Sequence, residues 1–148
     1  MKELESILIV EDNANDANLA LIAIRKLKLL HEVNVATDGH EAFDFLFQRG
    51  THSHRKPSEI LLVLLDIKMP KIDGFEVLRK IREDKKLCLI PVVIFSSSRQ
   101  ESDIKTAYEL GANGYVVKPV DFQEFTSAIT DIIRFWTLRN ESVPHLRR

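Results

Sequence analysis

The stretch that decides the fold is Ile60-Leu61-Leu62-Val63-Leu64-Leu65-Asp66, an unbroken apolar run that ends in a carboxylate. A run this short and apolar predicts a strand buried on both faces, as in a parallel sheet covered by helices. A charged group at its end is costly unless it has a partner or a function. The turn that follows contains Pro70 and Gly74. We therefore expect Asp66 at the C-terminal edge of a central strand, where open parallel sheets bind ligands.

Other apolar runs of strand length precede and follow this stretch, and segments with helical spacing separate them. The runs are Ile7-Leu8-Ile9-Val10, Val33-Asn34-Val35, Val92-Val93-Ile94-Phe95 and Tyr115-Val116-Val117. Helices are expected over residues 14–30, 40–47, 75–81, 104–110 and 122–136. Five strands alternating with five helices predict an α/β fold, a doubly wound parallel sheet with helices on both faces.

The last expected helix carries the clearest apolar stripe. Its members are Phe122, Phe125, Ile129, Ile132, Ile133 and Trp136. Asp121 with Glu124 resembles a capping box at its start. Phe135 lies off the centre of the stripe, and two adjacent large aromatic residues cannot both point inward from one helix. We therefore expect an apolar patch with Phe135 and Trp136 that pairs with a second copy of the chain, giving a homodimer.

Length and composition favour one domain with a sizeable core. The chain has 148 residues, with 21 Lys and Arg against 22 Asp and Glu, so no basic field argues for nucleic acid. Cys88 is the single cysteine, which excludes an internal disulfide. No stretch approaches the roughly 18 apolar residues of a membrane helix. The expectation is a cytoplasmic protein that binds neither nucleic acid nor membrane.

Residues 1–139 are expected to form the domain, with residues 140–148 as a flexible tail that leaves no room for an output domain. The stretch from Gln48 to Glu59 is expected to be an exposed loop before the central strand, and the sequence does not define its role.

Polar residues follow four of the five expected strands. Glu11-Asp12 ends the first run, Asp66 the third, Ser96 the fourth and Lys118 the fifth. Carboxylates brought together repel one another unless a cation lies among them, and oxygen ligands suit Mg²⁺. A carboxylate cluster, a hydroxyl and a lysine are the groups needed to handle a phosphoryl group, with one carboxylate as nucleophile.

In this order, these residues resemble the receiver domain of two-component response regulators. The motifs that carry the resemblance are Glu11-Asp12, Asp66-x-x-Met69-Pro70-x-x-Asp73-Gly74, Ser96 and Gly111-Ala112-x-Gly114-Tyr115-x-x-Lys118-Pro119. The resemblance covers nearly the whole chain. It implies the flavodoxin-like strand order 2-1-3-4-5. It also implies a phosphorelay function, in which a histidine kinase is the phosphoryl donor and the receiver is a phosphoprotein rather than an enzyme.

The resemblance assigns a role to each matching residue around the acceptor. Asp66 becomes the phospho-acceptor and, with Asp12, a direct ligand of Mg²⁺. Glu11 acts on the ion mostly through water, and the backbone carbonyl of Lys68 is the third protein ligand.

On the other side of the acceptor, the resemblance makes Ser96 the switch hydroxyl and Tyr115 the switch aromatic residue, which moves inward on phosphorylation. Lys118 binds the phosphoryl oxygens, and the bond between Lys118 and Pro119 is expected to be cis. The long loop and the Phe135-Trp136 pair are similar to response regulators that partner phytochrome-type histidine kinases. The downstream partner stays open. Output is expected through the face near the last two helices.

Two alternatives come from other classes of protein. A phosphatase with a transient aspartyl nucleophile often carries a second Asp two residues further on, and Lys68 stands at that position. A nucleotide-binding or flavin-binding module would need a phosphate-binding loop after the first strand, where two acids stand instead.

Overall fold

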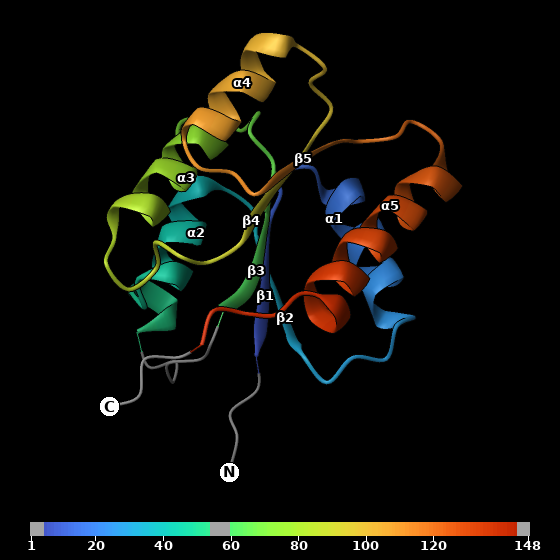
Figure 1. Ribbon diagram of the computed structural model, residues 1–148, viewed down its shortest axis with the longest axis horizontal. Coiled ribbons are helices and arrows are strands. Elements are labelled where there is room, and N and C mark those ends of the chain that lie inside the picture. Colours follow the sequence, from blue (N-terminus) through green and yellow to red (C-terminus); the bar gives the residue numbers. More distant parts are fainter. Residues whose placement is uncertain (1–4, 54–59, 145–148) are drawn as a thin grey trace.

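The sheet of this protein is parallel throughout, with strand order β2-β1-β3-β4-β5, which confirms the predicted fold class. The computed structural model describes residues 5–53 and 60–144 (Figure 1). The strands are β1 (Ser6–Val10), β2 (Glu32–Ala36), β3 (Ile60–Leu65), β4 (Val92–Ser96) and β5 (Gly114–Val117). The helices are α1 (Ala14–Arg25), α2 (Gly39–Leu46), α3 (Gly74–Glu83), α4 (Glu101–Glu109) and α5 (Phe122–Arg134). A short 3₁₀ turn, η1 (Gly50–His52), and a π-helical turn, η2 (Phe135–Arg139), complete the described elements.

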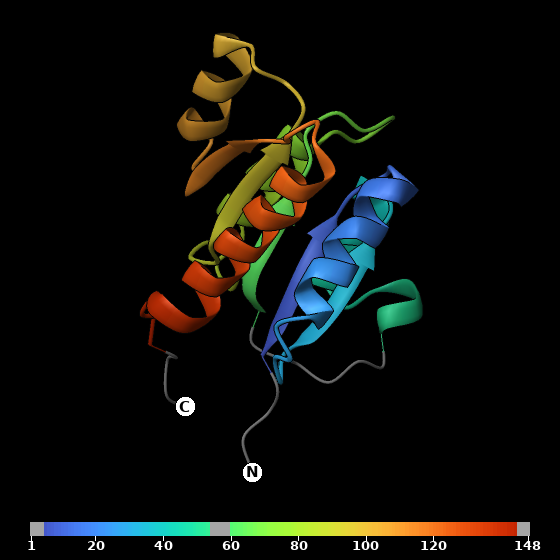
Figure 2. The same ribbon diagram turned by 90° about the vertical axis from the view of Figure 1, so that its right-hand side faces the viewer.

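Helices cover the sheet on both faces, with α1 and α5 on one face and α2 and α3 on the other (Figure 1). Figure 2 shows α1 and α5 side by side over the sheet. Alternate residues of the strand β3 pack in the two apolar layers on either side of the sheet. Val63 and Leu65 pack on the α2–α3 side, and Leu62 and Leu64 pack on the α1–α5 side. All six of its residues are buried, so its apolar run cannot alternate with polar residues.

Side-chain caps fix the start of four helices directly after the strand-end loops. Asn13, Asp38, Asp73 and Asp121 each accept a hydrogen bond from the backbone N–H three residues further on. Such a cap contributes about 1 kcal/mol to stability. The caps therefore hold the first turn of each of these helices in a fixed place beside the strand ends.

Gly74, the first residue of α3, brings that helix unusually close to the strand β3. A Cβ atom at this position would lie 2.2 Å from the carbonyl oxygen of Asp66 and 2.7 Å from Cα of Ile67. Backbone cannot move aside as a flexible side chain can, so only glycine fits. This close approach fixes the backbone of Asp66 against α3.

The helix predicted over residues 14–30 is shorter than expected. It ends at Arg25, and Lys28 adopts a left-handed φ of 52°, which a continuing helix excludes. Leu27 and Leu29 still pack against the core from the following turn, so their helical spacing was a misleading signal.

The predicted apolar stripe of the last helix is confirmed at its centre, where Phe125, Ile129, Ile132 and Ile133 are buried. Phe122 is 58% exposed and lies outside the buried stripe. Trp136 packs partly against the core, whereas Phe135 is 50% exposed, as expected for two adjacent aromatic residues. Both belong to the π-helical turn, in which the N–H of Asn140 donates to the carbonyl of Phe135.

None of the helices in the described part of the chain has the length and apolar content that a bilayer span requires. The predicted loop is described only as far as Ser53, where η1 lies, and its residues 54–59 fall outside the described ranges. Of the predicted tail, residues 140–144 are described and contain no helix or strand.

Candidate functional site

The site lies at the C-terminal edge of the sheet, where backbone hydrogen bonds extend the strand ladders into the loops. The N–H of Glu11 donates to the carbonyl of Ala36 at 2.9 Å, and the N–H of Asp66 donates to that of Val10 at 3.0 Å. On the other side, the N–H of Lys118 donates to the carbonyl of Ser96 at 2.8 Å. The sheet itself therefore places the backbone of the residues that are predicted to form the site.

Three carboxylates gather at this edge, as predicted. Glu11, Asp12 and Asp66 each offer an oxygen, and these oxygens lie within 4.8 Å of one another. Glu11 is 5% exposed and Asp66 is 6% exposed, so water screens them poorly, while Asp12 is exposed. Oxygen donors so close together, with one open side, form a set that a hard divalent cation can use.

The ammonium of Lys118 lies among carboxylates. Its Nζ lies 2.7 Å from Oε1 of Glu11, 2.8 Å from Oδ2 of Asp16 and 3.2 Å from Oδ2 of Asp66. The lysine side chain is only 9% exposed. The structure therefore brings the predicted lysine to the predicted acceptor.

The predicted cis bond between Lys118 and Pro119 is wrong, because the described residues contain no cis peptide bond. The trans form is the lower-energy state of an X-Pro bond. In this structure Lys118 reaches Asp66 from a trans bond.

The surroundings change the proton affinities of two groups at the site. Burial raises the pKa of Glu11 to about 7; Lys118 opposes this effect and the charge of Asp66 adds to it. Burial works to lower the pKa of Lys118, but hydrogen bonds to Asp16 and Glu11, with the charge of Asp66, raise it above its ordinary value. The lysine is therefore a permanent cation at neutral pH, and Glu11 is held near its titration point.

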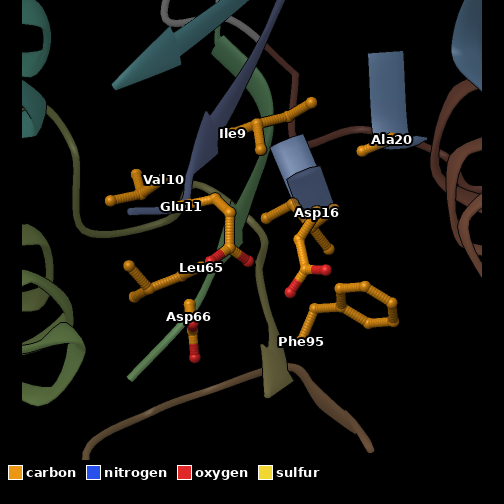
Figure 3. A pocket seen from close by; sticks show the side chains of 9 residues that line it. Ile9, Val10, Glu11, Asp16, Ala20, Leu65, Asp66 and Phe95 are labelled. Atoms are coloured by element: carbon orange, nitrogen blue, oxygen red, sulfur yellow. The ribbon is translucent and has the colours of Figure 1, made fainter. Parts of the chain in front are cut away.

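The cavity at this edge has a volume of about 10 Å³, and the carboxylates of Glu11, Asp16 and Asp66 line it together with the ring of Phe95 (Figure 3). Pockets for cofactor-sized ligands measure roughly 300–1,000 Å³. A nucleotide or a flavin does not fit here, which argues against the alternative of a nucleotide-binding module at this edge.

The two residues predicted to form the switch, Ser96 and Tyr115, both contact Ser98. Ser96 is fully buried, and its Oγ accepts a hydrogen bond from the N–H of Ser98 at 3.2 Å. The hydroxyl of Tyr115 donates to the carbonyl of Ser98 at 3.0 Å. Ser98 thus links the two predicted switch residues.

Asp103, in the first turn of α4, joins this loop to the loop after β3. Its Oδ2 accepts a hydrogen bond from Oγ of Ser98 at 2.5 Å and lies 3.1 Å from Nζ of Lys68. The hydrogen bond from Ser98 lowers the pKa of Asp103, and Lys68 adds to the effect. The side chain of Lys68 is therefore paired with Asp103. The metal-binding role predicted for Lys68 concerns its backbone carbonyl.

Asp16 and Asp103 are the site residues that the sequence did not reveal. Both lie in the first turn of a helix rather than at a strand end, and the prediction followed strand ends alone. A usable signal existed for Asp16, since it stands three residues after the helix-capping Asn13 and so faces the strand-end loops.

Comparison with known proteins gives a consistent result. A family model described as the response regulator receiver domain matches residues 7–130. Response regulator Rcp1 of Synechocystis sp. is 35% identical over 131 residues, which cover 88% of this chain and 87% of Rcp1.

Solved structures are similar over nearly their full length. The Mn²⁺-bound form of Rcp1 superposes with a TM-score of 0.87, at 33% identity, and covers 94% of this chain and 99% of that one. The phosphorylated cyanobacterial phytochrome response regulator RcpA gives a TM-score of 0.88 at 36% identity, covering 95% and 99%. The bacteriophytochrome response regulator AtBRR is 49% identical, with a TM-score of 0.74 and coverage of 94% and 99%.

Proposed function

Because this chain belongs to the response regulator receiver domain family, we propose that Asp66 is the residue that accepts a phosphoryl group from the phosphohistidine of a histidine kinase. An oxygen of Asp66 attacks phosphorus, the P–N bond breaks, and its electron pair returns to the imidazole nitrogen. The product is an aspartyl phosphate. The observation that carries this proposal is the position of Lys118 Nζ, 3.2 Å from Asp66 Oδ2 beside a cluster of carboxylates.

Mg²⁺ is the proposed cofactor, and the residues present fit it. Glu11, Asp12 and Asp66 supply hard oxygen donors, and the single charge of Lys118 does not balance three carboxylates. In this role Asp12 and Asp66 would hold the ion directly, together with the carbonyl of Lys68. A bound divalent ion supplies positive charge for the phosphoryl oxygens.

The proposed activity is signalling and not turnover. Phosphatases with an aspartyl nucleophile often carry a second Asp two residues after it as the general acid, and Lys68 stands at that position.

Acetyl phosphate with Mg²⁺ tests the acceptor. Wild type is expected to gain one phosphoryl mass increment, and Asp66→Ala is expected to gain none. Glu109→Ala, an exposed acid at the end of α4, is a control that should be modified like wild type. Modification that persists in Asp66→Ala would exclude Asp66 as the acceptor.

A phytochrome-type kinase is the proposed donor. The similarity to RcpA and AtBRR, both described as response regulators of phytochromes, supports it. Phosphotransfer from a purified phytochrome kinase should label this chain faster than transfer from a kinase of another sensory class. Equal rates with both kinases would count against the pairing.

We also propose a homodimer through the end of the last helix. Phe135 is 50% exposed and lies edge to face against Trp136 at 5.1 Å, and Leu138 beside them is 65% exposed. Apolar side chains grouped in this way favour burial against a partner. Output through the neighbouring face of α4, β5 and α5 would then respond to Ser96 and Tyr115.

Size-exclusion chromatography tests the dimer. Wild type is expected to elute as a dimer and Phe135→Ala as a monomer. Leu89→Ala removes a side chain that is 67% exposed in the loop before β4, and it should leave the dimer intact. A monomeric wild type, or a dimer that survives Phe135→Ala, would overturn the proposal.

A further inference from the structure

Asp16 makes a contact that the proposed phosphoryl acceptor does not itself require. Its Oδ2 lies 2.8 Å from Nζ of Lys118, almost as close as the oxygen of Glu11 at 2.7 Å. An ammonium has three N–H donors. With Asp66 as the third contact, at 3.2 Å, all three donors face a carboxylate. Because the lysine side chain is only 9% exposed, water has little access to replace a lost partner.

The backbone of Asp16 is held in place independently of Asp66. The N–H of Asp16 donates to Oδ1 of the capping residue Asn13 at 3.0 Å, and the N–H of Ala17 donates to the carbonyl of Asn13 at 3.0 Å. Ala17 and Ala20 on the same helix are buried. Asp16 therefore approaches Lys118 from a rigid first turn of α1, and Figure 3 shows it on the opposite side of the cavity from Asp66.

Asp16 does not belong to the metal-ligating group. The carboxylate oxygens that lie within 4.8 Å of one another come from Glu11, Asp12 and Asp66. Asp16 contacts the lysine instead, and its side chain is 25% exposed. Its role is therefore to be sought in what the lysine does.

We propose that Asp16 is a positioning residue for phosphoryl transfer, one that aims the ammonium of Lys118 at Asp66. Asp16 and Glu11 hold two of the three N–H groups, so the third points at the acceptor oxygen. When that oxygen becomes part of an acyl phosphate, the third N–H passes to a phosphoryl oxygen while the other two stay bound. This role rests on the proposed function of Asp66. Asp16 itself makes and breaks no covalent bond.

The contact of Lys118 with Asp66 is the longest of the three, which supports different roles for Asp66 and for the two closer carboxylates. Lys118 lies closer to Glu11 and Asp16 than to Asp66, so the two shorter contacts define where the ammonium lies. Without Asp16, one N–H loses its partner, and the ammonium is free to turn toward Glu11 and Asp66. The lysine then keeps two carboxylate partners, so its charge stays compensated and the fold is expected to persist.

The test measures the rate of phosphorylation by acetyl phosphate at saturating Mg²⁺, as a function of donor concentration. An oxygen of Asp66 attacks phosphorus and acetate leaves with the electron pair of the broken P–O bond. Asp16→Ala is expected to lower the maximal rate by about tenfold or more, the effect of one lost hydrogen bond to a charged group. The donor concentration at half-maximal rate and the affinity for Mg²⁺ should change by less than about threefold, because Asp16 contacts neither.

Asp16→Asn retains an oxygen acceptor in the same place and is expected to recover most of the rate. Asp131→Ala, an exposed acid of α5, serves as the matched control and should react like wild type. A wild-type rate in Asp16→Ala would overturn the positioning role, and so would a loss that appears only in donor or Mg²⁺ affinity. If Asp16→Ala does not fold, Asp16→Asn and Asp16→Ser are compared with wild type instead. In that case, an Asp16→Asn variant that reacts more slowly than wild type would overturn the proposal.

The same measurement separates this inference from the function beneath it. If wild type is modified at a residue other than Asp66, the proposed function fails. If Asp66 is modified and Asp16→Ala reacts at the wild-type rate, the function stands and only the positioning role fails.

Discussion

The binding of Mg²⁺ is expected to become weaker as the pH falls from 8 to 6, because Glu11 must lose a proton when the ion enters. Burial raises the pKa of this carboxyl to about 7, and the neighbouring charge of Asp66 works in the same direction. At pH 7 about half of the ion-free molecules therefore carry a proton on Glu11. That proton neutralises one carboxylate of the cluster in which the ion would bind.

The magnitude follows from the competition between the proton and the ion. With a pKa of about 7, the apparent affinity falls by a factor of about 11 at pH 6, about 2 at pH 7 and about 1.1 at pH 8. Between pH 8 and pH 6 the dissociation constant should thus rise about tenfold. The dissociation constant rises at low pH because the raised pKa keeps a proton on Glu11 up to neutral pH in the ion-free protein. This proton must be released when Mg²⁺ binds.

Isothermal titration with Mg²⁺ at pH 6, 7 and 8 measures the change. Repeating the titration at pH 7 in buffers of different ionisation enthalpy should report about half a proton released per ion bound. Glu11→Gln carries no titratable proton and should show a much flatter pH dependence. Dissociation constants equal within twofold at pH 6 and pH 8 would refute the reasoning, as would the same slope in Glu11→Gln.

Two further predictions concern residues that hold the surrounding loops. Arg82 of α3 donates to the carbonyls of Gly111, Cys88 and Ile90 and to Oδ1 of Asn113, at 2.7–3.0 Å. Arg82→Met should lower the free energy of unfolding by about 3 kcal/mol, measured by urea denaturation, and a loss below about 1 kcal/mol would contradict it. Asp103→Asn should cost about 1 kcal/mol at pH 7. Because the pKa of Asp103 is lowered, that advantage of the wild type is lost as the pH falls through and below its ordinary range near 3.8. Urea denaturation at pH 7 and pH 3 checks this, and an equal difference at both values would contradict it.

The fold was predictable because its apolar runs are short and separated. The strand β3 shows this most clearly, since both of its faces are buried and its sequence contains no polar residue before Asp66. Helix ends were less predictable. Leu27 and Leu29 pack against the core from a turn that follows α1, so apolar spacing alone could not locate Arg25 as its last residue.

The strand-end residues of the site were predictable for a related reason. Parallel strands bring their C-terminal ends to one edge, so polar residues directly after Val10, Leu65 and Val117 must lie near one another. The first turn of a helix lies at the same edge, but its side chains point there only if the helix begins at a particular residue. For α1 the predicted start at residue 14 agrees with the observed start at Ala14, so the place of Asp16 in the first turn could have been inferred from the sequence, together with the capping residue Asn13.

The charges at the site limit what Lys118 alone can stabilise. The ammonium of Lys118 contacts the carboxylates of Glu11, Asp16 and Asp66, and the carboxylate of Asp12 lies in one cluster with those of Glu11 and Asp66. Four carboxylates and one ammonium leave an excess of three negative charges when every group is ionised. A phosphoryl group would add about two more. Two unit charges 4 Å apart interact by about 4 kcal/mol at an effective dielectric constant of 20, so the lysine alone cannot offset this repulsion. Since all three of its N–H groups already face carboxylates, the additional positive charge must come from a bound cation. A divalent cation held by Glu11, Asp12 and Asp66 would supply this charge, and the ionised form of Glu11 would favour its binding.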